Sequence, residues 1–174
     1  KYMQMKRFLF FIVVVLIPAL GFAQKKVYIF KPRVSEFAPT NLLDSKTIQV
    51  NYKDTRITHK KSKVECTFEE LTSVINESLK AAFPKAVLVE SADADIVLNI
   101  KVKRYEVFFP GGVWRGFAEY DVELIHGPDE IKQEILGTRT EGNIWGIKTA
   151  KKVLQMSFDR ANEDLVKLLI EHLE

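Results

Sequence analysis

Three acidic residues at alternate positions are the first candidates for chemistry in this chain. Glu119, Asp121 and Glu123 lie in a stretch with strand character, so their side chains would form a row on one face of a strand. Such a row of carboxylates could hold a hard cation through oxygen ligands. If the preceding segment pairs with it as a hairpin, however, Lys101 and Lys103 lie opposite these acids. We therefore predict a charge-paired, solvent-exposed surface and no metal site.

The other residues that could carry chemistry are scattered. His59, His126 and His172 are far apart and do not have the spacing of metal ligands. Cys66 is the single cysteine, and we interpret it as a small buried hydrophobe beside a helix rather than as a nucleophile. Nucleophile-elbow, zinc-protease, phosphate-loop and dinucleotide-binding motifs are absent from the sequence. The sequence therefore predicts a protein that is not an enzyme and that uses no cofactor.

The most informative residues are aromatic and surround a turn signal. The Pro-Gly-Gly run at residues 110–112 predicts a turn between two strands, and turn tips are normally polar, whereas here apolar rings flank the turn. A third strand that returns to this end would bring Trp145 near Trp114. An exposed apolar patch of this kind usually marks contact with a partner protein or an acyl chain; in the alternative interpretation, the N-terminal segment folds over the rings and buries them. The candidate binding residues of this aromatic tip are Tyr105, Phe108, Phe109, Trp114, Phe117 and Trp145.

The elements that position the aromatic tip follow from hydrophobic periodicity. Thr67 and Glu70 have the spacing of a capping box, and apolar residues at helical spacing continue from there to Pro84, which ends the helix. A longer amphipathic helix runs from about Thr149 to the C-terminus. Residues 53–63 are polar and basic, which predicts an exposed connection that could include an edge strand. The expected strands cover residues 27–30, 47–52, 86–89, 96–102, 118–124 and 131–145.

Charge pairing sets the predicted register of the central hairpin. If the hairpin is centred on the turn, each lysine faces an acid: Lys103 faces Glu119, and Lys101 faces Asp121. A third antiparallel strand then completes a meander. The expected fold class is α+β, a two-layer sandwich in which a mostly antiparallel sheet with a central three-strand meander is covered on one face by two helices.

The N-terminal region has the order of a secretory signal peptide. Lys6 and Arg7 precede an apolar run over residues 8–17, after which Pro18 and small residues follow. The uncharged stretch over residues 8–23 is shorter than the roughly 20 residues that cross a bilayer. We predict a signal peptide over residues 1–23, cleaved after Ala23, and one α+β domain over residues 24–174; an uncleaved anchor is the alternative. The protein is expected to be exported, either to the periplasm or out of the cell.

Removing the leader leaves 23 basic and 23 acidic residues, so the remaining chain has no net charge. A neutral chain has no general electrostatic attraction to nucleic acid, and we predict none as a partner. Charge is nevertheless uneven, because residues 24–67 carry a net charge of +6 and residues 68–174 a net charge of −6. The two parts could simply pair with each other. Alternatively, the basic strip over residues 59–63 touches anionic lipid headgroups or glycans.

Three runs of sequence carry a resemblance to known proteins. They are residues 92–100 with the start Ala-Asp-Ala-Asp, residues 118–124, and the Ser-Phe-Asp-Arg-Ala run at residues 157–161 that leads into a leucine-rich helix. In layout, residues 67–174 resemble small bacterial envelope lipoproteins, in particular the YajG-like family and the auxiliary lipoproteins of ABC-type transport systems. The resemblance implies an α+β envelope domain without catalysis, in which the long C-terminal helix has small residues on its inner face. This chain departs from those families because no cysteine stands at the expected cleavage site, which favours a form without a lipid anchor and leaves association with the outer membrane open.

Two hypotheses for function follow. The first is a non-enzymatic envelope protein that acts as a binding or assembly component of a transport or surface system, with the aromatic tip contacting an envelope protein. The alternative is a carrier or sensor of a small apolar ligand, such as a lipid, held between the sheet and the helices. Peripheral contact with a membrane is compatible with both hypotheses.

Overall fold

The computed structural model describes residues 27–57, 59, 62, 64–91 and 93–173. The predicted signal peptide, and the three lysines of the basic strip at positions 60, 61 and 63, lie outside the described residues. The helices are α2 (Phe68–Ala82) and α3 (Ile147–Leu173). The strands are β1 (Tyr28–Ile29), β2 (Thr47–Asp54), β3 (Val64–Glu65), β4 (Val87–Val89), β5 (Ile96–Phe108), β6 (Val113–His126) and β7 (Asp129–Gly142).

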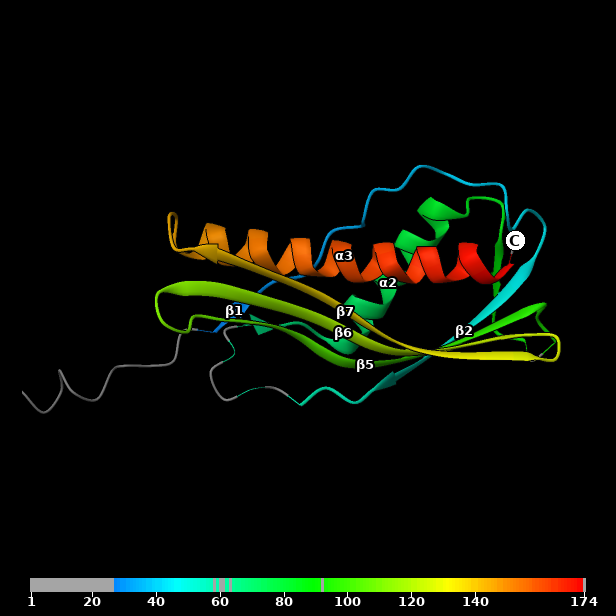
Figure 1. Cartoon of the computed structure of the whole chain (residues 1–174), viewed down its shortest axis with the longest axis horizontal. Coiled ribbons are helices and arrows are strands. Elements are labelled where there is room, and N and C mark those ends of the chain that lie inside the picture. The colour runs from blue at the N-terminus through cyan, green and yellow to red at the C-terminus, as the bar shows by residue number, and fades with distance from the viewer. Residues whose placement is uncertain (1–26, 58, 60–61, 63, 92, 174) are drawn as a thin grey trace, which may run out of the picture.

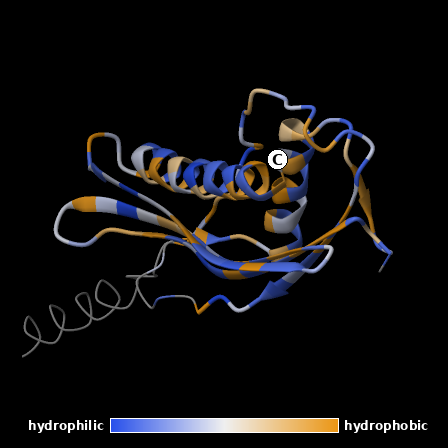
Figure 2. Ribbon diagram, turned by 45° about the vertical axis from the view of Figure 1, so that its right-hand side comes forward, coloured by the Kyte–Doolittle hydropathy of each residue, from blue (hydrophilic) through white to orange (hydrophobic). Residues whose placement is uncertain are grey.

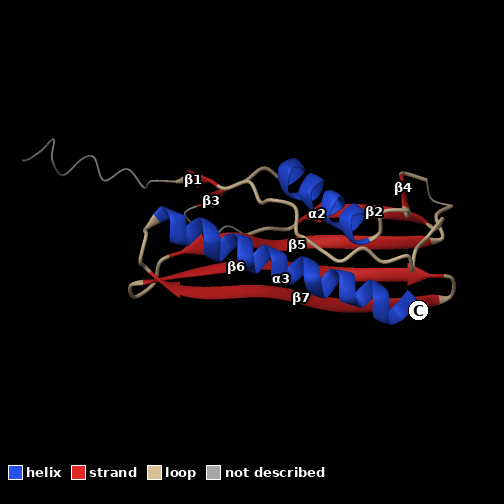
Figure 3. Cartoon of the chain, turned by 90° about the horizontal axis from the view of Figure 1, so that it is seen from above, coloured by secondary structure: helices blue, strands red, loops and turns tan. Residues whose placement is uncertain are grey.

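Both helices lie on one face of a five-stranded sheet, as Figures 1 and 3 show. The strand order is β4-β2-β5-β6-β7, and β1 pairs with β3 in a separate two-stranded sheet. The predicted α+β class, with two helices on one face, is therefore confirmed. The prediction of a mostly antiparallel sheet holds for the meander alone: β5, β6 and β7 are antiparallel as expected, but β2 is parallel to both β4 and β5, so the sheet is mixed. The parallel pairing arises because α2 lies between β2 and β4, and a helical crossover returns the chain in the same direction.

Helix α2 begins as the sequence predicts. The Thr67 hydroxyl accepts a hydrogen bond from the backbone N–H of Glu70, and the Glu70 carboxylate accepts one from the backbone N–H of Thr67, so the capping box is complete. These two bonds satisfy N–H groups that have no partner within the first turn of a helix. The predicted helix is confirmed.

The central hairpin has the predicted register along only part of its length. Lys101 pairs with Asp121 as expected, but the register then shifts at a bulge, so that Arg104, rather than Lys103, lies opposite Glu119. Lys103 occupies the extra position, and its Nζ still reaches the carboxylates of Glu119 at 2.9 Å and Asp121 at 3.2 Å. The predicted charge-paired surface is therefore confirmed, although the bulge was not predicted. Beyond it the alternation of β5 is inverted, because one extra residue exchanges the two faces of a strand.

Close contact between α3 and the sheet depends on two glycines. A Cβ atom at Gly137 on β7 would overlap the backbone carbonyl of Ser157, and one at Gly116 on β6 would lie 2.9 Å from the carbonyl of Val153. Ser157 and Ala161 are the small residues of α3 that face the sheet here, and both are fully buried. In the sequence, Gly137 only interrupts the alternation of the third strand; in the structure it allows the helix backbone to lie directly on the strand.

The segment between β1 and β2 runs over the outer side of the helices (Figure 1). Ser35 holds it there: its backbone N–H donates to Ser78 Oγ of α2 at 3.0 Å, and its hydroxyl donates to Asp159 of α3 at 2.8 Å. Asn162 of α3 donates to the same hydroxyl oxygen at 3.1 Å. The N-terminal part of the described chain is therefore joined to both helices.

One end of the sheet is fastened by the Ala-Asp run that the sequence singles out. The Asp95 carboxylate, just before β5, accepts hydrogen bonds from both the backbone N–H and the hydroxyl of Thr47 at the start of β2, each at 2.8 Å. The backbone N–H of Asp95 donates to the Thr47 hydroxyl in return, at 2.9 Å. This reciprocal pair aligns the two parallel strands at their first residues.

Candidate binding site

The sheet separates the residues of the predicted aromatic tip into two groups. Tyr105 and Trp114 face the helices, and each is only 7% exposed. The Tyr105 hydroxyl donates a hydrogen bond to the backbone carbonyl of Phe30 at 2.9 Å, and its ring packs edge-on against Phe158 of α3. Because its ring and hydroxyl are both engaged inside the fold, Tyr105 is a core residue.

Phe108 and Phe117 lie on the opposite face of the sheet and stack on each other, with their ring centroids 5.5 Å apart. The imidazole of His59 stacks on Phe108 at 5.2 Å, and the guanidinium of Arg104 lies 4.0 Å from the centroid of Phe117. These contacts leave both rings half-buried. His59, in the segment that follows β2, therefore covers part of these aromatic rings, whereas the burial interpretation expected the N-terminal segment to bury them.

Trp114 joins the β5–β6 turn to the β7–α3 connection. Its ring packs against Phe109 of the turn, with centroids 4.8 Å apart, and its Nε1–H donates to Asn143 Oδ1 at 3.0 Å. Asn143 Oδ1 also accepts the backbone N–H of Gly146 at 2.9 Å. The two loops therefore lie together at one end of the molecule, which we call the aromatic end (Figures 1 and 3).

Trp145 does not lie in the third strand, which ends at Gly142 rather than at residue 145 as predicted. Gly146 has a φ of 57°, a left-handed conformation that glycine adopts easily, and α3 begins at the next residue. The strand-to-helix connection thus projects its side chains outwards, and Trp145 is 75% exposed.

The apolar surface that the aromatic end exposes is therefore different from the predicted tip. Its members are the large hydrophobic residues of the two loops and of the first position of α3, and Figure 2 shows a short hydrophobic stretch within the otherwise pale β7–α3 connection. We call this surface the exposed rim: Phe109 (38% exposed), Ile144 (76%), Trp145 (75%) and Ile147 (46%).

Lysines follow the exposed rim directly along the first two turns of α3. Lys148, Lys151 and Lys152, with Arg33 of the N-terminal segment, line a shallow groove of about 410 Å³. Sequence reasoning missed these lysines and the two isoleucines of the rim. The signal was present, because residues 143–152 read Asn-Ile-Trp-Gly-Ile-Lys-Thr-Ala-Lys-Lys and contain no acidic residue.

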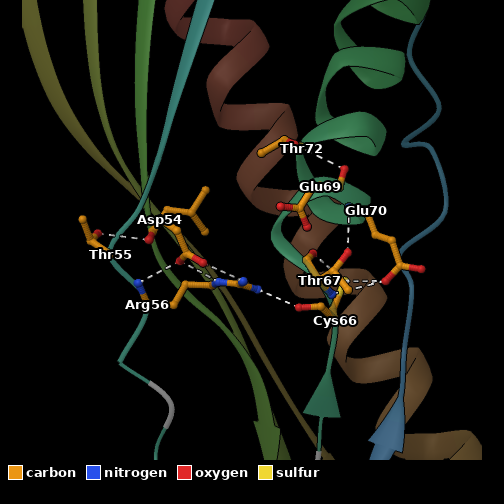
Figure 4. Close-up of polar contacts among 9 residues, drawn as sticks. Asp54, Thr55, Arg56, Cys66, Thr67, Glu69, Glu70 and Thr72 are labelled. Carbon is orange, nitrogen blue, oxygen red and sulfur yellow. Dashed lines mark hydrogen bonds and ion pairs between the residues drawn. The ribbon is translucent and has the colours of Figure 1, made fainter.

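A second hollow, of about 590 Å³, lies where β2 ends and α2 begins, and several of its polar groups are paired with one another. Arg56 donates two hydrogen bonds from its guanidinium to the Asp54 carboxylate, both at 2.8 Å, and a third to the backbone carbonyl of Cys66 at 3.0 Å (Figure 4). These hydrogen bonds to Arg56 lower the pKa of Asp54. Burial raises the pKa of the half-buried Cys66 thiol to about 11, so the thiolate nucleophile is scarce at neutral pH. The arrangement stabilises the fold here rather than offering reactive groups.

Within the described residues, no group of three or more histidine, cysteine or acidic side chains is placed to hold a metal ion. In the same part of the chain, no helix combines the length and the apolar character needed to cross a membrane.

Comparison with solved structures shows the fold. The protein XCC0632 from Xanthomonas campestris, described as family DUF330, matches with a TM-score of 0.54 and 14% identity, over 83% of this chain and 95% of that one. An uncharacterised protein matches with a TM-score of 0.52 and 12% identity, over 79% and 99% of the two chains. The chain therefore has the fold of the DUF330 and ABC-transport auxiliary lipoprotein-like proteins, and the resemblance suggested by the sequence is confirmed for the fold.

Lipoprotein GNA1162 from Neisseria meningitidis is a more distant match, with a TM-score of 0.36 and 13% identity over 72% of this chain and 93% of that one. No protein-family model matches the chain, and no curated protein matches it either.

Proposed function

We propose that this protein is an exported, non-enzymatic component of the bacterial cell envelope that binds another envelope constituent through its aromatic end. The observation that carries the proposal is the exposed rim, in which Ile144 and Trp145 are each about three-quarters exposed beside Phe109 and Ile147. Contiguous large apolar side chains at the surface usually mark a contact site. The resemblance to envelope lipoproteins and the leader-like N-terminal sequence agree with an envelope location.

Trp145 replaces Trp114 as the residue on which this proposal depends. Trp114 supports the rim from beneath through its contacts with Phe109 and Asn143, so its replacement would disturb folding and contact together. Trp145 makes no side-chain hydrogen bond or ring contact among the described residues, and it can be varied without removing an internal contact of that kind.

Site-specific photocrosslinking in the native cells tests the proposal. A photoreactive amino acid at position 145 is expected to give discrete adducts in the envelope fraction. The same probe at Glu130, in the exposed start of β7 at the other end of the sheet, is the matched control and is expected to give none. Cell fractionation and N-terminal sequencing of the same samples give the location and the processing of the chain.

Three results would contradict the proposal: no adduct at position 145, equal adducts at positions 145 and 130, or a cytoplasmic protein that retains residues 1–23. Any one of them would rule out either the envelope location or the binding role of the aromatic end.

The alternative, a carrier of a small apolar ligand, has less support. The space between the sheet and the helices is filled, because Leu98, Ile100 and Phe158 are 1% exposed or less and α3 lies directly on Gly116 and Gly137. The 590 Å³ hollow beside α2 has the apolar residues Val27, Ile29 and Ile57 in its lining, together with charged groups. Native mass spectrometry of the protein purified from its own envelope distinguishes the two functions, since a co-purifying lipid mass is expected only for the carrier.

A further inference from the structure

We infer that the constituent recognised by the aromatic end is the surface of a bilayer containing anionic lipids, with the exposed rim inserted among the acyl chains and the adjacent lysines at the level of the phosphates. This inference rests on the proposed function, whose binding site it shares. It is carried by the placement of the rim next to the basic groove at the start of α3.

Helix stability does not explain the lysines at the start of α3. The N-terminus of a helix carries a partial positive charge, so acidic residues are favoured in its first turn and lysines are not. Helix α3 has no acidic residue in its first turn, and Lys148, Lys151 and Lys152 stand within its first two turns. Among the described residues, Lys148 and Lys151 have no ion-pair partner, whereas Lys152 pairs with Glu141 at 3.0 Å. An anionic surface outside the protein would supply the missing counter-charge.

The groove beside these lysines contains one acidic group, Asp159, and its carboxylate is engaged internally. It accepts hydrogen bonds from the Ser35 hydroxyl and from Gln155 Nε2, each at 2.8 Å. Arg33 lies on the other side of the groove. The groove therefore has four cations in its lining, of which Lys152 is paired with Glu141, and its one carboxylate is bonded internally, an arrangement that favours phosphate groups.

The rim has the composition of a membrane-interface anchor. Tryptophan is enriched at the boundary between headgroups and acyl chains, because its ring is apolar and its N–H is polar. At the aromatic end, Trp145 stands between two isoleucines, and both loops are free of charged residues: residues 109–112 read Phe-Pro-Gly-Gly and residues 143–146 read Asn-Ile-Trp-Gly. A protein partner would be expected to need complementary acidic or hydrogen-bonding groups in these loops, whereas a bilayer needs only apolar insertion and nearby cations.

The loops at the opposite end of the sheet are acidic, in contrast to the loops of the aromatic end. At the opposite end of the sheet, the β4–β5 connection contains Glu90, Asp93 and Asp95 and no basic residue. The β6–β7 turn leads into Asp129 and Glu130 at that same end, since His126 pairs with Ile96. An anionic surface would attract the lysines beside the aromatic end and would be disfavoured by these acidic loops. The first described strand, β1, also lies towards the aromatic end (Figures 1 and 3).

Vesicle binding by the exported protein tests the inference. We expect it to sediment with vesicles of phosphatidylcholine containing phosphatidylglycerol and to bind vesicles of phosphatidylcholine alone at least about tenfold more weakly. The double variant Lys148→Gln/Lys151→Gln should lower binding to the anionic vesicles about tenfold or more. The matched control, Lys46→Gln/Lys80→Gln, removes two exposed lysines from the other end and should leave binding unchanged. All variants share the same N-terminal residues, so the differences report on the aromatic end.

Tryptophan fluorescence gives an independent readout. Adding anionic vesicles should shift the emission of Trp145 to shorter wavelength, and the shift should disappear in Trp145→Phe although that variant still sediments. Trp145→Ser should lose both the shift and most of the binding, while Leu136→Ser, which removes an exposed leucine from the middle of β7, should bind normally.

Two results would overturn the inference: no binding of the unaltered protein to anionic vesicles, or binding that neither the lysine pair nor Trp145→Ser reduces. If vesicles do not bind but the photoreactive residue at position 145 captures an envelope protein in cells, the lipid inference fails and the proposed function stands. If position 145 captures nothing and vesicles do not bind, both fail.

Discussion

The two ends of the sheet differ in whether their functional-looking side chains are bonded within the fold or exposed to solvent. At the end formed by the β4–β5 connection and the β6–β7 turn, Asp95 and Thr47 exchange three hydrogen bonds that align two strands. At the aromatic end, Ile144 and Trp145 project into solvent. The first lysines of α3 lie at the positive end of the helix dipole, where positive charge is unfavourable. The first end is explained by folding alone. The second has no such internal explanation among the described residues, and this difference is the basis for the function that we propose for it.

The two tryptophans allow the sharpest test, because they lie at the same end and differ in burial. Trp114→Ala should lower the free energy of unfolding by about 3–5 kcal/mol, since a buried ring and its support of Phe109 are both lost. Urea denaturation monitored by circular dichroism measures this change. A loss below about 1 kcal/mol would show that the aromatic end is loosely packed beneath the rim.

Gly137→Ala should have the next largest effect, about 1–3 kcal/mol of destabilisation, because the added Cβ overlaps the Ser157 carbonyl and the backbone of α3 cannot yield locally. The same denaturation experiment measures it. Gly142→Ala is the matched control on the same strand, since a Cβ there meets nothing within 4 Å. Equal stability of the two variants would contradict the described contact between α3 and β7.

Asp95→Asn should destabilise the opposite end in a pH-dependent way. The hydrogen bonds from Thr47 lower the pKa of Asp95 below its ordinary value of 3.8. A carboxyl whose pKa is lower in the folded state stabilises the fold above its unfolded pKa, and this contribution is lost as the pH falls through the folded value. The difference in unfolding free energy between the two proteins should therefore be largest near neutral pH and shrink below about pH 4.

Trp145→Ala should have the smallest effect on stability, within about 0.5 kcal/mol, because the side chain is exposed. A clear destabilisation would mean that Trp145 packs within the fold, and the contrast between the ends would lose its functional meaning. Thermal unfolding at matched protein concentrations, alongside Trp114→Ala, measures it.

Local sequence signals predicted where the elements lie better than they predicted which residues of each strand face the helices. The capping box of Thr67 and Glu70 located α2, and the Pro-Gly-Gly run at residues 110–112 located the hairpin. The bulge was missed although it left a trace, because the adjacent Lys103 and Arg104 break an alternation that otherwise holds from Ile96. Since a bulge exchanges the faces of a strand, the sequence could indicate an aromatic end without showing that Tyr105 points inwards and Phe108 outwards. The parallel position of β2 depends on long-range pairing, for which no local pattern exists.

The bulge after Val102 also determines where β5 can lose a residue during evolution. Deleting Lys103 would restore an uninterrupted ladder and would leave Arg104 and Glu106 on the outer face, because Lys103 is the one extra residue of the bulge. A deletion elsewhere in β5 would exchange the faces of the residues between it and the bulge. Loss of a single codon should therefore be tolerated at Lys103 and eliminated in the rest of the strand.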